Sequence, residues 1–133
     1  MCDFFSRFDR KTKYTVLRQS NIYGPHDKYD LDKSHVFGAT ITKTMQADDK
    51  ITVWGTGEEE RDFLHVTDLI QLIEAVLENQ ITDYELINAS GGSSISIANL
   101  VKMIVDISGK GLKIEYDTTK PTIPTAFIFA FLK

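Results

Sequence analysis

Cysteine is almost absent from this 133-residue sequence, which contains only Cys2. A single thiol cannot form a disulfide within the chain, which excludes a disulfide-stabilised domain and suits a reducing compartment. Long apolar runs are also missing, since none approaches the roughly 20 residues that a membrane-spanning helix needs. The residues after Met1 lack the basic and apolar regions of a signal peptide. We therefore expect a cytoplasmic protein with no membrane partner.

Positive charge is not in excess either. Lysine and arginine together number 15 and the acidic residues 19, which gives a net charge of -4. A nucleic-acid-binding surface usually needs a basic stripe, so this balance argues against a nucleic-acid partner. We interpret the one acidic run, EEE at 58–60, as a solvated turn.

The compact ligand-binding motifs are absent as well. The sequence has no G-x-G-x-x-G loop, P-loop, C-x-x-C or H-E-x-x-H, so it predicts neither a complete dinucleotide site nor a metal site. The segment GTGEEE at 55–60 follows a predicted strand. It leads into another strand, however, and not into the helix N-terminus that would bind a phosphate. We therefore interpret it as a plain turn.

What is present is an alternation of strand-like and helix-like segments. Short β-branched and apolar runs predict strands, and apolar residues spaced three and four apart predict helices. The mixture predicts an α/β fold, with strands too few and too scattered for a complete doubly wound sheet. The predicted strands are 14–20, 50–55, 61–66, 84–90 and 112–117, and the predicted helices are 1–12, 35–47, 66–80 and 96–108.

The helix boundaries have their own signals. Ser34, Thr67 and Ser96 are the predicted N-caps of the last three helices, because a hydroxyl there can accept from a free backbone N–H. Gly109 is the predicted stop after the last helix. The first helix carries Phe4, Phe5 and Phe8 at helical spacing but has no visible N-cap, so it resembles the back half of a longer helix.

Two segments fit neither pattern. NIYGPHDKYDLDKSHV, residues 21–36, is a long polar connection, and long connections in compact domains are usually disordered or functional. The tail PTAFIFAFLK is apolar without alternation, and it resembles a terminus that has lost its continuation.

Several dispersed polar residues could form a site. Arg18 and Asn21 flank the end of a predicted strand, where α/β proteins commonly bind ligands. His35 lies at the first turn of a predicted helix, where the helix dipole would keep the imidazole neutral. Lys43 lies two turns further along the same helix, and we expect it on one face with Val36, Ala39 and Thr40.

Trp54 and Arg61 come from the two strands that follow this helix. Together with His35 and Lys43 they could bind a diphosphate and a flat ring. Each residue also has a purely structural interpretation. His35 could be a cap or a solvated side chain, Trp54 could pack in the core or at its rim, and Arg61 could pair with Asp62 on the surface. We interpret the two remaining histidines, His26 and His65, as structural.

The motifs taken in order resemble one enzyme family. RQSNIYGP, then His35 within DKSHV, then ITVWGTGEEERDFLHVTDLIQLI and YELINASGGSSISIANLV are similar to the C-terminal half of extended short-chain dehydrogenase/reductases that act on nucleotide sugars. The resemblance covers about residues 14–121. The spacing from Asn21 to His35 is most similar to that of the GDP-L-fucose synthase subfamily.

The resemblance implies roles for particular residues. Gln19, Ser20, Asn21 and Ile22 would line the nicotinamide side of NADP or NAD, and His35 would be the general acid that returns a proton to the enolate of a 4-keto sugar. The substrate contacts would come from Lys43, Trp54, Arg61 and Lys120. Lys43 stands where the family has an arginine, which puts a bidentate contact there in doubt.

The departures from the family are also informative. The glycine-rich loop and the Tyr-x-x-x-Lys pair of the family's Rossmann half have no counterpart here, and Cys2 is not in the place of the family's catalytic cysteine. We therefore expect a Rossmann remnant at 1–20, a nucleotide-sugar-binding domain at 21–121 and an apolar truncated tail at 122–133. A truncated or frameshifted reading frame would explain both ends.

Three functions remain open at this point. The first is the substrate-binding part of an NAD(P)-dependent nucleotide-sugar epimerase/reductase that is inactive alone and does not bind its cofactor alone, with a GDP-sugar favoured over a UDP-sugar. The second is a relative of the UDP-hexose 4-epimerases or dehydratases, which normally lack the histidine. The third is a non-catalytic binding module or fragment that forms homo-oligomers through exposed apolar surface.

Overall fold

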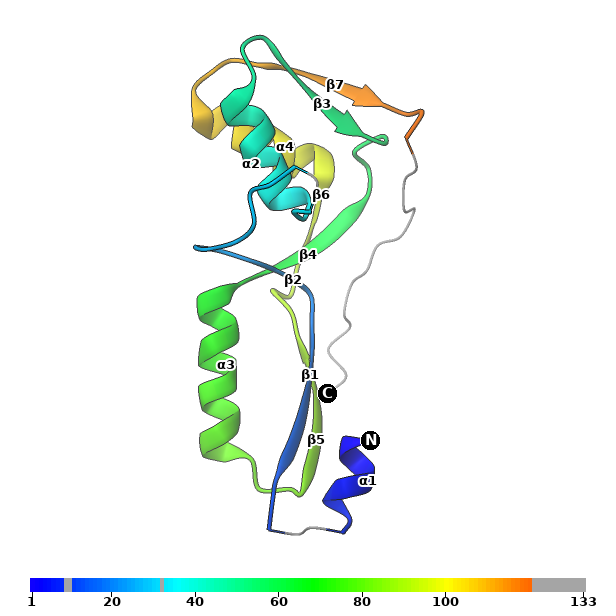
Figure 1. The fold of residues 1–133 in the computed structure, drawn as a ribbon, viewed down its shortest axis with the longest axis vertical. Helices are drawn as coiled ribbons and strands as arrows, with labels where there is room; N and C mark the ends of the chain where they lie inside the picture. Colours follow the sequence, from blue (N-terminus) through cyan, green and yellow to red (C-terminus); the bar gives the residue numbers. More distant parts are fainter. Residues whose placement is uncertain (9–10, 32, 121–133) are drawn as a thin grey trace.

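The computed structural model describes residues 1–8, 11–31 and 33–120 (Figure 1). No helix in this described part is long and apolar enough to cross a membrane. The predicted tail lies outside the described residues. The helices are α1 (Cys2–Ser6), α2 (Val36–Gln46), α3 (Val66–Asn79) and α4 (Ile97–Ser108), and the strands are β1 (Tyr14–Gln19), β2 (Asn21–Tyr23), β3 (Lys50–Trp54), β4 (Glu60–His65), β5 (Tyr84–Ala89), β6 (Ser94–Ser96) and β7 (Lys113–Asp117).

Within the described residues the strands form three small sheets, which confirms the predicted α/β fold with scattered strands. β1 pairs in parallel with β5, and β3 pairs in parallel with β7. β4 lies between β2, to which it is parallel, and β6, to which it is antiparallel. In Figure 1 the β1–β5 pair lies at one end with α1 and α3, the β3–β7 pair lies at the other with α2 and α4, and β4 joins the two ends.

The main core lies at the β3–β7 end. α4 turns an apolar face inward, and Val101 on that face is completely buried. The predicted cap and stop of this helix are confirmed: Ser96 Oγ accepts from Asn99 N at 3.2 Å, and Gly109 ends the helix in the left-handed conformation at φ 68°. The buried core residues are Ile51, Val53, Ile97, Leu100, Val101, Val105 and Leu112.

Two other predicted caps are wrong. His35 occupies the N-cap of α2 with extended backbone, and the buried Ser34 Oγ has no hydrogen-bond partner among the described residues. His65 caps α3, since its side chain accepts from Thr67 N at 3.3 Å. Both helices begin directly after a histidine with extended backbone, which is the backbone conformation of an N-cap residue. The hydroxyl side chains of Ser34 and Thr67 favour the N-cap position, but neither residue occupies it.

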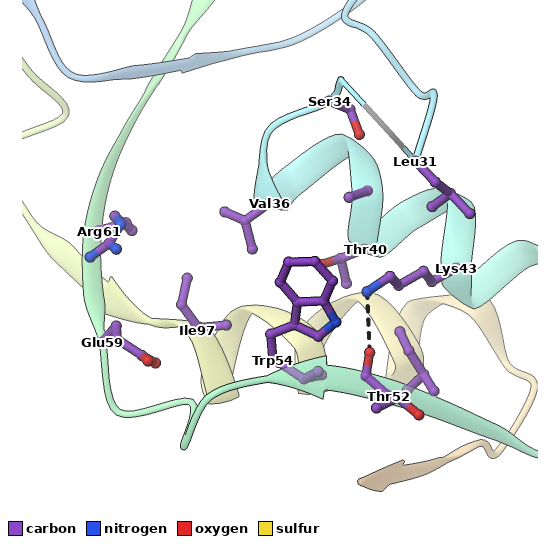
Figure 2. A pocket seen from close by; sticks show the side chains of 13 residues that line it. Leu31, Ser34, Val36, Thr40, Lys43, Thr52, Trp54, Glu59, Arg61 and Ile97 are labelled. Carbon is purple, nitrogen blue, oxygen red and sulfur yellow. Dashed lines mark hydrogen bonds between the residues drawn. The ribbon is translucent and has the colours of Figure 1, made fainter. Parts of the chain in front are cut away.

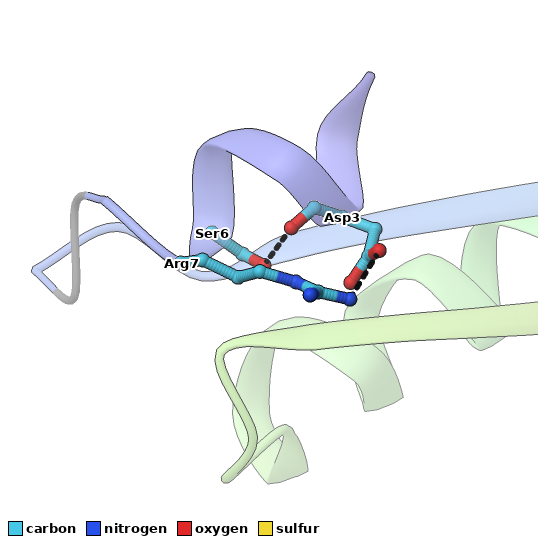
Figure 3. Close-up of polar contacts among 3 residues, drawn as sticks. All are labelled: Asp3, Ser6 and Arg7. Carbon is cyan, nitrogen blue, oxygen red and sulfur yellow. Dashed lines mark hydrogen bonds and ion pairs between the residues drawn. The ribbon is translucent and has the colours of Figure 1, made fainter.

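At the β1–β5 end α3 is present as predicted, whereas the helix predicted over 1–12 is only the short α1, and both helices bury little. α3 has no buried residue, and Leu77 on its apolar stripe is 79% exposed. The phenylalanines of α1 are exposed too. This helix is held instead by local contacts, in which Ser6 Oγ donates to Asp3 O at 2.8 Å and Arg7 Nη2 pairs with Asp3 Oδ2 at 2.8 Å (Figure 3).

A buried carboxylate ties the middle of the molecule together. Asp62 in β4 is only 2% exposed, and its Oδ1 and Oδ2 accept from the backbone N–H groups of Gly91 at 2.8 Å and Gly92 at 3.2 Å. A Cβ on Gly91 would lie 2.3 Å from Phe63 O, so only glycine allows this close approach. Asn21 Nδ2 donates to Asp62 O at 2.9 Å. The alternative of a surface Arg61–Asp62 ion pair is therefore wrong.

We predict that Asp62→Ala lowers the free energy of unfolding by about 3 kcal/mol, because two buried backbone donors lose a charged acceptor. Asp62→Asn should cost less, since its amide oxygen can still accept from one of the two. Urea unfolding followed by circular dichroism measures both. Asp106→Ala is the control, because its ion pair with Lys102 is exposed. Equal stabilities of the Asp62→Ala and Asp106→Ala variants would contradict the prediction.

Lys110, which follows α4 in the sequence, caps the C-terminus of α2. Its ammonium donates to Met45 O at 2.6 Å, Ala47 O at 2.7 Å and Thr44 O at 3.2 Å. These carbonyls lie at the C-terminus of the helix, where the macrodipole is negative and the backbone acceptors lack intrahelical partners. The ammonium therefore both satisfies the acceptors and neutralises the helix end.

Replacing this ammonium should be measurable. We expect Lys110→Met to lower the free energy of unfolding by about 1 kcal/mol, because the carbonyls lose their charged donor. Lys102→Met serves as the matched control on the exposed face of α4. In chemical denaturation Lys110→Met should have a lower free energy of unfolding than Lys102→Met. If that difference stayed unchanged in 1 M salt, it would argue against an electrostatic cap.

Candidate functional site

A pocket with a volume of about 660 Å³ lies between α2, the end of β3 and the segment that enters β4 (Figure 2). Its wall combines apolar side chains with three charged ones, a composition typical of small-molecule sites. The lining residues are Leu31, Ser34, Val36, Ala39, Thr40, Lys43, Ile51, Thr52, Val53, Trp54, Glu59, Arg61 and Ile97.

One face of α2 forms a wall of this pocket. Val36, Ala39, Thr40 and Lys43 all line it, so the predicted shared face is confirmed. These residues are three and four positions apart, which places them on one side of a helix. The helix begins directly after the extended His35, and this start sets which residues turn toward the pocket.

Trp54 ends β3 in the pocket and attracts two cations. Its ring is exposed, with 60% of the residue accessible, which excludes the interpretation of Trp54 as a core residue. Lys43 Nζ lies 5.6 Å from the ring centroid and Lys120 Nζ lies 5.7 Å from it, within the range of cation–π attraction. Lys43 Nζ also donates to Thr52 O at 3.3 Å (Figure 2).

The β3–β7 pairing brings Lys120 to this tryptophan. The register places Asp117 opposite Trp54, and Gly55 N donates to Asp117 O at 2.9 Å. A tight turn follows, in which the side chain and the backbone N–H of Thr119 both donate to Asp117 Oδ1, at 2.6 Å and 3.0 Å. The Thr119 side-chain hydrogen bond, and after it the backbone one, lower the pKa of the Asp117 carboxyl. The turn points Lys120 back toward the ring.

Arg61 and Glu59 lie across Trp54 from Lys43 (Figure 2). Arg61 lines the pocket as predicted, and its Nη1 also donates to Glu60 O at 2.8 Å. Glu59 was missed, because EEE at 58–60 was interpreted as a solvated turn. Its Oε2 is shielded from solvent and has no hydrogen-bond partner in the described structure. The sequence did contain a signal for Glu59, because it lies two residues before Arg61. Residues two apart in extended backbone point to the same side.

The predicted cofactor contacts lie elsewhere, at the end of β1. Ser20 N donates to Ala89 O at 2.9 Å, and the Asn21 side chain donates to the backbone of β4, so part of this segment is used structurally. Gln19, Ser20, Asn21 and Ile22 do not line the pocket.

His35 and Arg18 are also placed apart from the pocket wall. His35 is exposed at the N-cap of α2 and is not a lining residue, so its catalytic role stays a prediction. Arg18 Nε donates to Asn88 Oδ1 at 3.0 Å and so links β1 to β5. The structure thus brings Lys43, Trp54 and Arg61 together in the pocket wall and places Lys120 beside the Trp54 ring, whereas neither His35 nor the predicted nicotinamide contacts line the pocket.

Two curated proteins are similar to this chain over most of its length. The GDP-L-fucose synthase of Sinorhizobium fredii is 37% identical over 106 residues, which cover 77% of this chain and 33% of that protein. The dTDP-4-dehydro-6-deoxy-D-allose reductase of Streptomyces bikiniensis is 33% identical over 110 residues, which cover 83% of this chain and 33% of that protein. The chain thus spans about a third of the length of these curated relatives.

A solved structure shares the fold. The crystal structure of a GDP-L-fucose synthetase from Naegleria fowleri bound to NADP superposes with a TM-score of 0.76 at 23% identity, covering 83% of this chain and 36% of that one. The family model described as "NAD dependent epimerase/dehydratase family" matches residues 5–90, which is more than half of the chain. On this match, the chain belongs to the NAD-dependent epimerase/dehydratase family.

Proposed function

We propose that the pocket binds a nucleotide-diphosphate sugar, a GDP-sugar in preference to a UDP-sugar. The chain would then be the substrate-binding part of an NAD(P)-dependent epimerase/reductase similar to GDP-L-fucose synthase. The observation that carries this proposal is that Lys43 and Lys120 both lie near the exposed Trp54 ring, at a pocket that Lys43, Trp54 and Arg61 line. Relatives named for GDP-sugars support it.

Each group has a chemical role in this proposal. The two ammonium groups near Trp54 supply positive charge for a diphosphate, and a partly apolar pocket strengthens that attraction relative to bulk water. The indole offers a flat surface for a ring of the ligand. Arg61, which lines the pocket across Trp54 from Lys43, is the proposed contact to the nucleoside.

His35 is the proposed general acid of the epimerisation. A 4-keto group on the bound sugar acidifies the hydrogens on C3 and C5. Transfer of one of them as a proton to a general base, a role that this proposal leaves to the family's catalytic cysteine outside these 133 residues, gives an enolate. The imidazole of His35 can then donate a proton to the opposite face of that carbon, which inverts its configuration. The position at the start of α2 supports the proposal, because the same helix carries Lys43 of the pocket.

The reductase step would need a hydride donor, and NADP or NAD supplies that chemistry in this family. Gln19, Ser20, Asn21 and Ile22 are the proposed contacts of this chain with it. Because these residues do not make a complete dinucleotide site, we propose that the chain does not bind the cofactor or turn over alone. In this division residues 1–20 belong to the cofactor-binding part, 21–121 to the substrate-binding part and 122–133 to an apolar tail.

Nucleotide binding can be followed through the only tryptophan in the sequence. We expect GDP to change the fluorescence of Trp54 in a saturable manner, with an affinity that falls as salt is added. Lys43→Met should weaken GDP binding about tenfold, or about 1.4 kcal/mol, because one charged contact is lost. Lys102→Met, outside the pocket, is the charge-matched control. If both variants bound GDP like the unchanged chain, Lys43 would have no role in binding.

Catalysis by the chain alone gives a separate test. We mix the 133-residue chain with NADPH and the GDP-4-keto-6-deoxy sugar, using at least as much protein as sugar. We expect the NADPH absorbance to stay constant. A full-length relative assayed under the same conditions shows that the reagents are active. NADPH oxidation by the chain alone, abolished in the His35→Ala variant, would contradict the proposed inactivity.

A further inference from the structure

We propose that the ring pair of Tyr23 and Phe37 positions His35, the proposed general acid, beside the predicted cofactor contacts. This inference rests on the proposed function and adds the residues that hold its acid in place. Tyr23 directly follows Ile22, the last of the predicted contacts, and Phe37 lies two residues after His35. The centroids of the two rings are 4.6 Å apart. Their contact therefore joins the end of β2 to the first turn of α2, across the long connection that separates them in the sequence.

The first turn of α2 lacks the usual local restraints. A helix begins with backbone N–H groups that have no partner within the helix, and a capping side chain or an acidic residue usually stabilises them. Here the His35 side chain makes no capping hydrogen bond, and the first turn contains no acidic residue. The hydroxyl of Ser34 has no partner among the described residues either. The ring contact of Phe37 supplies a tertiary restraint in place of the missing cap.

Tyr23 is itself fixed by β4. Its backbone pairs with that of His65, and the two rings meet in a T-shaped arrangement with their centroids 5.1 Å apart. His65 is held in turn, because its side chain accepts from Thr67 N at the start of α3. The chain then turns away at Gly24, where a Cβ would lie only 2.6 Å from Val66 Cγ1. The ring of Tyr23 is therefore a fixed support for the start of α2.

This support leaves the imidazole of His35 available for chemistry. The residue is exposed, and its side chain takes no part in capping the helix. A general acid has to lie within reach of the reacting carbon, and a misplacement of about 1 Å can slow a reaction about a hundredfold. The reductase step needs a hydride donor at the same sugar. Because the predicted cofactor contacts end next to Tyr23, the ring pair sets the distance between the proton donor and the hydride donor.

Two backbone amides of α2 test the ring pair without any ligand. The Ala39 amide donates to His35 O in the first turn, and the Ala47 amide donates to a carbonyl near the C-terminus, both at 2.9 Å. We expect Tyr23→Leu and Phe37→Leu, each of which removes one ring, to speed hydrogen exchange at Ala39 about fivefold. Exchange at Ala47 should stay unchanged. Tyr23→Phe keeps the ring and should match the unchanged chain. The two ring-removing variants are independent, so either one serves if the other does not fold.

A second readout links the ring pair to the proposed reaction. The NMR signals of the His35 ring are followed while GDP, and separately the GDP-4-keto-6-deoxy sugar, is added to the 133-residue chain. We expect the sugar nucleotide to shift these signals in the unchanged chain and to shift them much less in Tyr23→Leu. The affinity for GDP, measured through Trp54 fluorescence, should be the same in both. A role of Tyr23 in folding alone would not separate the two measurements.

The outcomes separate this inference from the function on which it rests. Unchanged exchange at Ala39 in the ring-removing variants, or equal acceleration at Ala39 and Ala47, overturns the inference. So does a sugar nucleotide that shifts the His35 signals equally in the unchanged chain and in Tyr23→Leu, or in neither of them. If the unchanged chain binds neither nucleotide, the proposed function fails, and exchange at Ala39 alone decides whether the rings hold the start of α2.

Discussion

The contact on which the rest of the structure depends is the buried carboxylate of Asp62 on the backbone of Gly91 and Gly92. A carboxylate that is nearly inaccessible to water must have its oxygens satisfied, and here backbone N–H groups do so. The contact fixes β4 to the segment that leaves β5. Because β4 is the strand that joins the two ends of the molecule, the β1–β5 pair and the β3–β7 pair take their relative position from it.

The same strand sets the chemistry of the pocket. Side chains alternate along β4, so Asp62 points into the protein while Arg61 faces the pocket. A shift of β4 by one residue would exchange these two side chains, leaving a cation buried and a carboxylate in the pocket. The hydrogen bonds of Asp62 therefore fix the register of β4, and this register places Arg61 in the pocket although Asp62 itself does not line it.

The sequence predicted the elements better than their details. The α/β alternation, the Ser96 cap and the pocket-facing side of α2 were all readable, because each follows from local periodicity or from one residue's preference. The caps at Ser34 and Thr67 were wrong because the neighbouring histidines hold the extended conformation. The short strand β2 was hidden within a polar segment, since its pairing with the distant β4 supplies what its composition lacks.

The site shows a similar division. Lys43, Trp54 and Arg61 could be named from residue type and order, and the structure brings them together. The buried state of Asp62 and the inward position of Glu59 could not be named, because both depend on partners far away in the sequence: Gly91 for Asp62, and Ile97 and Ala98 for the segment that carries Glu59. Charged residues in a run are usually solvated, and only tertiary contacts identify the exceptions.

The parallel pairing of β3 with β7 has a consequence for how the pocket is made. Its register joins Lys50 to Lys113, so a long stretch of chain that includes α3 and α4 must be arranged before the two strands meet. Contacts between such distant residues form late, because loop closure costs entropy before the pairing stabilises it. Trp54 is made early during synthesis on the ribosome, but its second cation, Lys120, arrives only after β7. The pair of cations at the Trp54 ring is therefore complete only after β3 and β7 have paired.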